Sequence, residues 1–125
     1  MRVLELDPRH AGASYMLGRL HASVLRLGGF KRFMAKQLFG GGALEGASWE
    51  EAQRLLEVAV VEDPCVSEHH FELAQVYAQR GDASGAEREL SYVRELTAGQ
   101  DGRQARLRQR ADELEREWGY ASLTL

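Results

Sequence analysis

The sequence predicts an all-α protein built from antiparallel pairs of helices. Apolar residues recur at spacings of three and four along most of the chain, which is the pattern of an amphipathic helix. The 125 residues include only two prolines, Pro8 and Pro64, so helices are sterically allowed almost everywhere else. No segment alternates polar residues with apolar and β-branched ones as a half-buried strand does. With 44% hydrophobic residues, the chain can form one core or a short stack of repeats that share one.

The N-terminal part is expected to contain two helices and a break. Apolar periodicity predicts a long helix over residues 10–27 and a shorter amphipathic helix over residues 30–39. Glycines are concentrated between residues 28 and 46, which marks this stretch as the main break in helical order.

Capping residues mark the boundaries of the next helices. Ser48 and Glu51 form a capping box that starts a helix by satisfying free amide groups, and Pro64 ends it. Gly81 ends the following helix, because glycine tolerates the left-handed conformation that follows a helix C-terminus. The helices after Pro64 are expected over residues 66–80, 84–96 and 103–118.

One helix pair carries the signature of a known repeat. Residues 67–100 have small residues where two helices would cross closely and larger apolar residues between them: Leu73, Ala74, Tyr77, Gly81, Ala86, Leu90 and Leu96. This pattern resembles the tetratricopeptide repeat, a 34-residue helix–turn–helix unit. The resemblance implies a superhelical stack of helix pairs in which the first helix of each pair lines a concave groove.

The preceding unit matches the same pattern if it contains an insertion. Leu17 and Ala52 correspond to Leu73 and Ala86 of the regular repeat. The first pair is 35 residues apart and the second pair 13, a surplus of 22. This unit is therefore a repeat interrupted between its two helices.

A second pair of landmarks gives the same insertion length. Pro8 and Pro64 are 56 residues apart, which exceeds one repeat by 22. We therefore predict a single domain, residues 1–125, whose partial first repeat leaves an open apolar edge. Its parts are a partial repeat at 1–8, a repeat at 11–66 with the insertion around 26–47, a regular repeat at 67–100 and a capping helix at 103–118.

The interrupted repeat is similar to one particular family of tetratricopeptide-like proteins. The segments 17–19, 30–40 and 47–52 are similar to bacterial relatives of the regulator of microtubule dynamics family. Those proteins resemble tetratricopeptide modules with a long first helix and an inserted amphipathic segment. The resemblance implies the fold alone, because no residue in this sequence is a known determinant of a microtubule role.

The concave groove is the expected binding site for a protein or peptide partner. Positions carried over from the repeat place these residues in the groove: Tyr15, Arg19, Ala22, Phe71, Gln75, Ala78 and Gln79. Aromatic residues and arginine are common anchors of protein interfaces. Tyr15 and Phe71 could equally belong to the core.

The inserted helix is the most distinctive segment. Phe30, Phe33, Met34 and Leu38 can share one face, with basic residues elsewhere. Such a helix either docks on a membrane or partner, or folds back onto its own repeat. We favour the second interpretation and expect no membrane contact, since three basic residues give only modest membrane affinity.

Metal binding and catalysis are not expected. Cys65 and His69 would lie one helical turn apart beside His70, but they do not complete a tetrahedral site. No phosphate-binding loop or nucleophile motif is present, so we expect no cofactor and no enzymatic activity. Most carboxylates are expected on solvated helical faces in weak ion pairs: Glu50, Glu51, Glu87, Glu89, Glu113, Glu115 and Glu117.

The charge distribution favours protein partners over nucleic acid. The net charge is −3, which argues against general binding to nucleic acids. Residues 1–47 carry +4 and residues 48–125 carry −7, which suits head-to-tail association. The alternative function is therefore self-assembly into a homodimer through the open N-terminal edge or the inserted helix. The chain has no signal-peptide pattern and no long apolar run, so a cytoplasmic location is favoured.

Overall fold

A computed structural model describes residues 2–26 and 48–124, and every regular element in these two segments is a helix. The predicted all-α class is therefore confirmed. The chain divides into two compact units, Met1–Asp63 and Pro64–Leu125. Among the described helices, none is both long enough and apolar enough to cross a membrane.

The helix bounds follow the expected ones to within two residues, except at the C-terminal end. The first unit contains α1 (Arg2–Leu6), α2 (Ala11–Arg26) and α5 (Trp49–Glu62). The second unit contains α6 (Ser67–Gln79), α7 (Ala83–Thr97) and α8 (Arg103–Thr124). The last helix continues past residue 118, where apolar periodicity alone had ended it. The helix expected over residues 30–39 lies outside the described residues.

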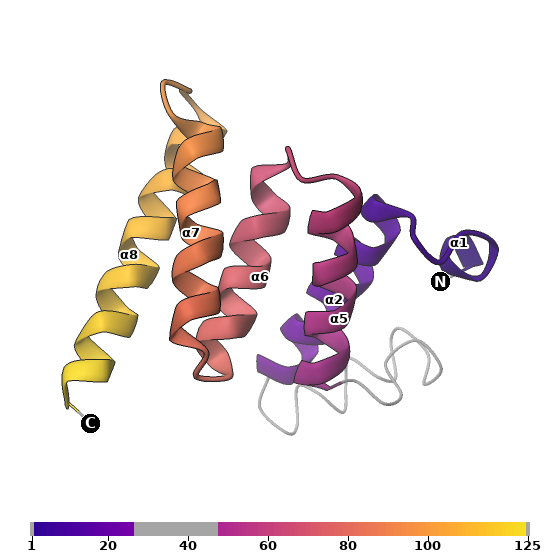
Figure 1. The fold of residues 1–125 in the computed structure, drawn as a ribbon, viewed down its shortest axis with the longest axis horizontal. Coiled ribbons are helices and arrows are strands. Elements are labelled where there is room, and N and C mark those ends of the chain that lie inside the picture. Colours follow the sequence, from indigo (N-terminus) through magenta and orange to yellow (C-terminus); the bar gives the residue numbers. More distant parts are fainter. Residues whose placement is uncertain (1, 27–47, 125) are drawn as a thin grey trace. The chain divides into compact units, whose positions relative to one another are not determined.

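In the first unit, α2 and α5 pack along each other (Figure 1). The close approach is at Gly18, where a Cβ atom would lie 2.9 Å from Leu56 Cγ and 3.2 Å from the carbonyl oxygen of Ala52. Gly18 is therefore required by space, since any side chain would push the two helices apart. Arg9 also donates a hydrogen bond to Glu62 at the far end of α5.

The start of α5 forms half of the expected capping box. The hydroxyl of Ser48 accepts a hydrogen bond from the amide of Glu51 at 3.0 Å. The carboxylate of Glu51 does not return to Ser48, because it accepts hydrogen bonds from Arg54 instead. This hydrogen bond lowers the pKa of Glu51. The helix begins where the sequence predicts, with the acidic side chain engaged along the helix surface.

In the second unit, a three-residue turn connects α6 to α7. Gly81 has a φ of +79°, and the amide of Asp82 donates to the carbonyl of Tyr77 at 2.8 Å. The amide of Gly81 donates to the carbonyl of Ala78 at 3.1 Å, which completes a Schellman motif. The carboxylate of Asp82 then accepts a hydrogen bond from Gly85 and caps α7. The chain can thus reverse within three residues and lay α7 against α6.

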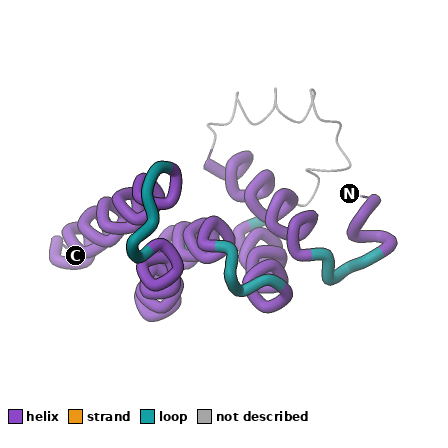
Figure 2. The backbone as a smooth tube through the Cα atoms, turned by 90° about the horizontal axis from the view of Figure 1, so that it is seen from above, coloured by secondary structure: helices purple, strands orange, loops and turns teal. Residues whose placement is uncertain are grey.

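The helix α8 packs against both α6 and α7, and a short loop connects it to the end of α7 (Figure 2). Two glycines in the left-handed region, Gly99 and Gly102, form the bends of this loop. One apolar cluster joins the three helices, and its buried members are Phe71, Ala74, Leu90, Val93, Leu107 and Ala111. Arg94 on α7 adds ion pairs to Asp112 and Glu115 on α8.

Replacing Gly18 tests the close approach of α2 and α5. We expect Gly18→Ala to lower the free energy of unfolding by about 1 to 3 kcal/mol, because the new methyl group overpacks the contact. Gly12→Ala on the same helix is the control, since its nearest neighbour, in His10, is 3.4 Å away. That control should be neutral or stabilising by up to about 1 kcal/mol. Urea denaturation followed by circular dichroism measures both, and equal effects of the two changes would contradict the contact.

Candidate functional site

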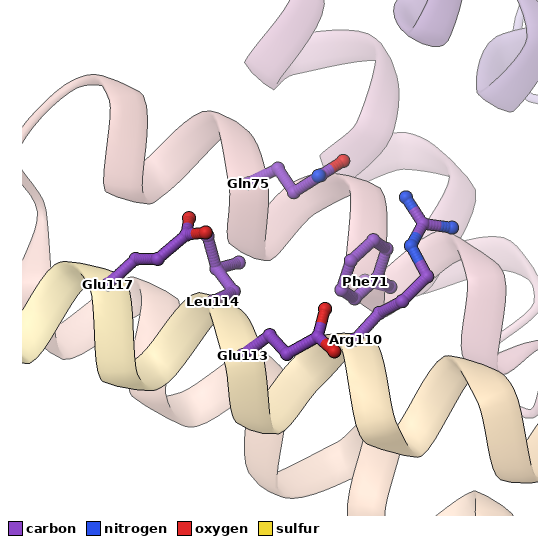
Figure 3. Close-up of a pocket in the computed structure, with 6 residues that line it drawn as sticks. All are labelled: Phe71, Gln75, Arg110, Glu113, Leu114 and Glu117. Carbon is purple, nitrogen blue, oxygen red and sulfur yellow. The ribbon is translucent and has the colours of Figure 1, made fainter.

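A groove of about 180 Å³ lies between α6 and α8 in the second unit (Figure 3). Two of its residues come from α6 and the rest from α8: Phe71, Gln75, Arg110, Glu113, Leu114 and Glu117. The α8 residues follow one another at spacings of three, one and three, so they share one face of the helix. The groove combines an apolar floor with charged and amide side chains along its edges.

Phe71 forms the floor and is also part of the core. Its side chain is only 2% exposed and belongs to the apolar cluster that joins the three helices. The guanidinium carbon of Arg110 lies 4.6 Å from the centre of the phenylalanine ring. This distance is within the range of a cation–π interaction, which favours arginine over lysine because the planar group can stack. The ring of Phe71 is therefore fixed by the apolar cluster beneath it, and the guanidinium group of Arg110 lies near it at one end of the groove.

The edges of the groove carry opposite charges. Arg110, Glu113 and Glu117 are exposed on α8. Within the described residues, neither carboxylate takes part in an ion pair. Gln75 faces them from α6 with an amide group that can both donate and accept hydrogen bonds. The groove thus has polar groups available for a ligand on both helices.

A second polar cluster is buried between α6 and α7. His70 and Glu89 are each about 5% exposed in their side chains, and His70 Nδ1 lies 2.6 Å from a carboxylate oxygen of Glu89. The other ring nitrogen, Nε2, lies 2.7 Å from the carbonyl oxygen of Pro64. A carbonyl oxygen can only accept, so Nε2 carries a proton and donates it. The ring of Tyr92 covers the histidine at a centroid distance of 4.8 Å.

The electrostatics of this pair favour a charged histidine. Burial is the largest single influence and lowers the pKa of His70, but the hydrogen bond from the ring to Glu89, the carbonyl of Pro64 and the charge of Glu89 together outweigh it. The resulting pKa lies above its ordinary value. Both ring nitrogens are already bonded, so His70 has no nitrogen left for a metal ion or a substrate. The pair is best described as a buried connection between α6 and α7.

This finding corrects one expectation from the sequence. Glu89 was assigned to a solvated face with its neighbour Glu87, yet Glu89 is buried and Glu87 is exposed. The two positions are two residues apart, so they point to different sides of a helix. A buried carboxylate needs a partner, and His70 supplies it from 19 positions earlier in the chain.

Comparison with models of known protein families identifies one match. A family model described as regulator of microtubule dynamics protein 1-3 matches residues 1–119. The chain belongs to the regulator of microtubule dynamics family. Comparison with curated proteins and with solved structures found no match. The resemblance stated from the sequence is confirmed for this family, and the matched residues include the whole groove.

In this regulator of microtubule dynamics family member, two of the seven residues expected in the concave groove line the groove between α6 and α8. These are Phe71 and Gln75, whereas Gln79 is exposed one turn further along α6. Ala22 is buried on α2 and Ala78 half-buried on α6. Tyr15 is half-buried and Arg19 exposed on α2 in the first unit, and neither lines this groove. The residues expected on the inserted helix lie outside the described residues: Phe30, Phe33, Met34 and Leu38.

The α8 side of the groove was missed because α8 was interpreted only as a cap. A signal for it was present in the repeat length. The regular repeat starts at residue 67, so the next 34-residue period starts at 101, just before α8. By that arithmetic, α8 occupies the place of a first helix, which lines the groove in tetratricopeptide repeats.

The metal interpretation of the residues around Cys65 gains no support from the geometry. Cys65 is exposed, while His69 is buried on α6 and His70 is bonded at both nitrogens. In the described part of the chain, no three metal-ligating side chains come together.

Removing the carboxylate of Glu89 tests the buried pair. We expect Glu89→Gln to destabilise the fold by about 3 kcal/mol near neutral pH, because it breaks a buried ion pair. The exposed neighbour change Glu87→Gln is the control and should stay within about 0.5 kcal/mol.

The pH dependence gives a second measure of the same pair. A raised histidine pKa means that the folded chain holds the proton more tightly than the unfolded chain. Its stabilisation is fully present below about pH 6.5 and is lost as the pH rises through the folded pKa. Between about pH 6 and pH 8, the free energy of unfolding measured by urea denaturation should therefore fall less in Glu89→Gln than in wild type. An unchanged decline would contradict the assignment.

Proposed function

We propose that this chain is a protein-interaction module that holds a peptide or helix of a partner in the groove between α6 and α8. One observation carries the proposal: the groove brings Arg110 close to the aromatic ring of Phe71 at its floor, beside a row of polar groups. Aromatic residues and arginine contribute most to binding in protein interfaces. The tetratricopeptide-like pattern of the sequence supports the same surface, because its first helices line the groove.

The size of the groove favours a protein ligand over a cofactor. Pockets for small molecules usually enclose about 300 to 1,000 Å³, and this groove is about 180 Å³. Its carboxylates, on Glu113 and Glu117, are exposed on one helix face instead of being paired in a dry site. We therefore propose binding without catalysis. The microtubule role in the family's name is not part of this proposal, because the groove residues carry no feature specific to tubulin.

A second candidate is self-association through the first unit. Large apolar side chains are exposed there: Leu6 by 79%, Val61 by 65% and Met16 by 55%. Exposed apolar groups of this kind are common at protein interfaces. A chain that remains strictly monomeric in sedimentation at high concentration excludes this candidate.

Peptide selection on the purified chain tests the groove. Peptides selected from a random phage library would be synthesised and their affinities measured by fluorescence polarisation. We expect the double change Gln75→Ala, Arg110→Ala to weaken them by about tenfold, because it removes polar contacts of the groove. The fold should tolerate both changes, since neither side chain is buried.

The control variant removes the same residue types at positions outside the groove. Arg106 and Gln109 are exposed on α8 and do not line the groove. The double change Arg106→Ala, Gln109→Ala removes the same two residue types and should leave the affinities within about twofold. If the two double variants lose affinity for the selected peptides equally, or if neither loses affinity, the groove is excluded as the binding site.

A further inference from the structure

We infer that the groove between α6 and α8 takes a short extended segment with an acidic and a basic side chain on either side of apolar residues. This inference rests on the proposed function, and it names the chemistry of the partner. It follows from the order of charges along α8, from the groups that remain available for a ligand, and from the size of the groove.

The charges are ordered along the groove. Figure 3 shows Arg110 at one end and Glu117 at the other, with Glu113 between them. Arg110 and Glu117 are seven residues apart on one helix, which corresponds to about 10 Å along its axis. The groove therefore has a cationic end and an anionic end about 10 Å apart.

Both ends have unused binding capacity. Within the described residues, Glu113 and Glu117 form no ion pair, and both are exposed. The guanidinium carbon of Arg110 lies 4.6 Å from the centre of the Phe71 ring, and its N–H groups can donate to a ligand. A carboxylate of the partner fits these groups with two parallel hydrogen bonds. An ammonium or guanidinium group of the partner fits the two carboxylates.

The middle of the groove has a small apolar surface among polar groups. Leu114 is half-buried there and packs on the same cluster as Phe71. Across from it, the amide of Gln75 can donate to and accept from the backbone of an extended chain. A partner residue placed between the two charged ends would therefore meet Leu114, the amide of Gln75 and the carboxylate of Glu113.

The dimensions favour an extended segment over a helix. An extended chain advances about 3.3 Å per residue, so about three steps cover the 10 Å between the charged ends. A helix bound in a groove needs anchors over several turns. A groove of about 180 Å³ provides space for only a few side chains.

Uniformly charged segments fit less well. A purely acidic segment would place one carboxylate against Glu113 and Glu117, and a purely basic one would place a cation against Arg110. Like charges at close range disfavour both. The order of charges thus selects a mixed partner and rejects the uniform ones.

Four synthetic peptides of about eight residues test the preference for mixed charge on the wild-type chain. Each has two central leucines, flanked by glutamate and lysine, by lysine and glutamate, by two glutamates or by two lysines. The better mixed peptide should bind about fivefold more tightly than either uniform one at low salt. Isothermal titration calorimetry measures the four dissociation constants.

Charge reversal provides the matched variant. The double change Glu113→Lys, Glu117→Lys should shift the preference to the peptide with two glutamates. The double change Glu87→Lys, Glu95→Lys alters the net charge equally on exposed positions of α7 and should leave the preference unchanged. This control separates the groove from the overall charge of the chain.

The outcomes distinguish the two levels of the proposal. If phage-selected peptides bind the groove but the synthetic set shows no preference for mixed charge, the inference is overturned and the proposed function stands. Equal shifts in the groove variant and the α7 variant also overturn it. If no peptide of either kind binds the groove, the proposed function fails as well.

Discussion

The second unit depends on the position of one aromatic ring. Phe71 lies on α6 and is covered by residues of α7 and α8, including Leu90, Val93 and Leu107. Burial of a phenylalanine side chain contributes about 2 to 3 kcal/mol, and here it requires all three helices at once. The same ring forms the floor of the groove under Arg110. Core packing and the candidate site therefore cannot vary independently in this unit.

Polar contacts determine where α8 lies along its neighbours. Arg94 reaches both Asp112 and Glu115, which are three residues apart on one face of α8. Arg108 donates to the carbonyl of Thr97 near the end of α7. At the other side, Gln104 donates to Glu68 at 2.7 Å and so connects the starts of α8 and α6. Partly exposed ion pairs add little stability, but together these contacts fix the register that brings the charged groove residues opposite α6.

Local signals predicted the helices well because each has a local cause. Gly81 has the left-handed conformation that its position after α6 requires, and Ser48 caps α5. The close approach at Gly18 was also predictable, since the repeat pattern places a small residue there.

Longer-range features could not be predicted from the same signals. Periodicity cannot tell that Glu89 is buried, because the pairing with His70 depends on how two helices meet. Likewise the face of α8 with Arg110 and Glu113 resembles any solvated helix until α6 is placed beside it. Phe71 was expected in either the groove or the core, and the structure shows that it serves both. Two residues expected in a concave groove, Phe71 and Gln75 of α6, line this groove, and its α8 residues were not expected there.

The most direct test is to map a bound peptide on the chain by nuclear magnetic resonance. The isotope-labelled chain would be titrated with a phage-selected peptide while backbone amide shifts are followed. We expect the largest shifts to cluster at residues 71–75 of α6 and 110–117 of α8. Largest shifts on α2 around Tyr15 and Arg19, or on the exposed face of α7, would contradict it.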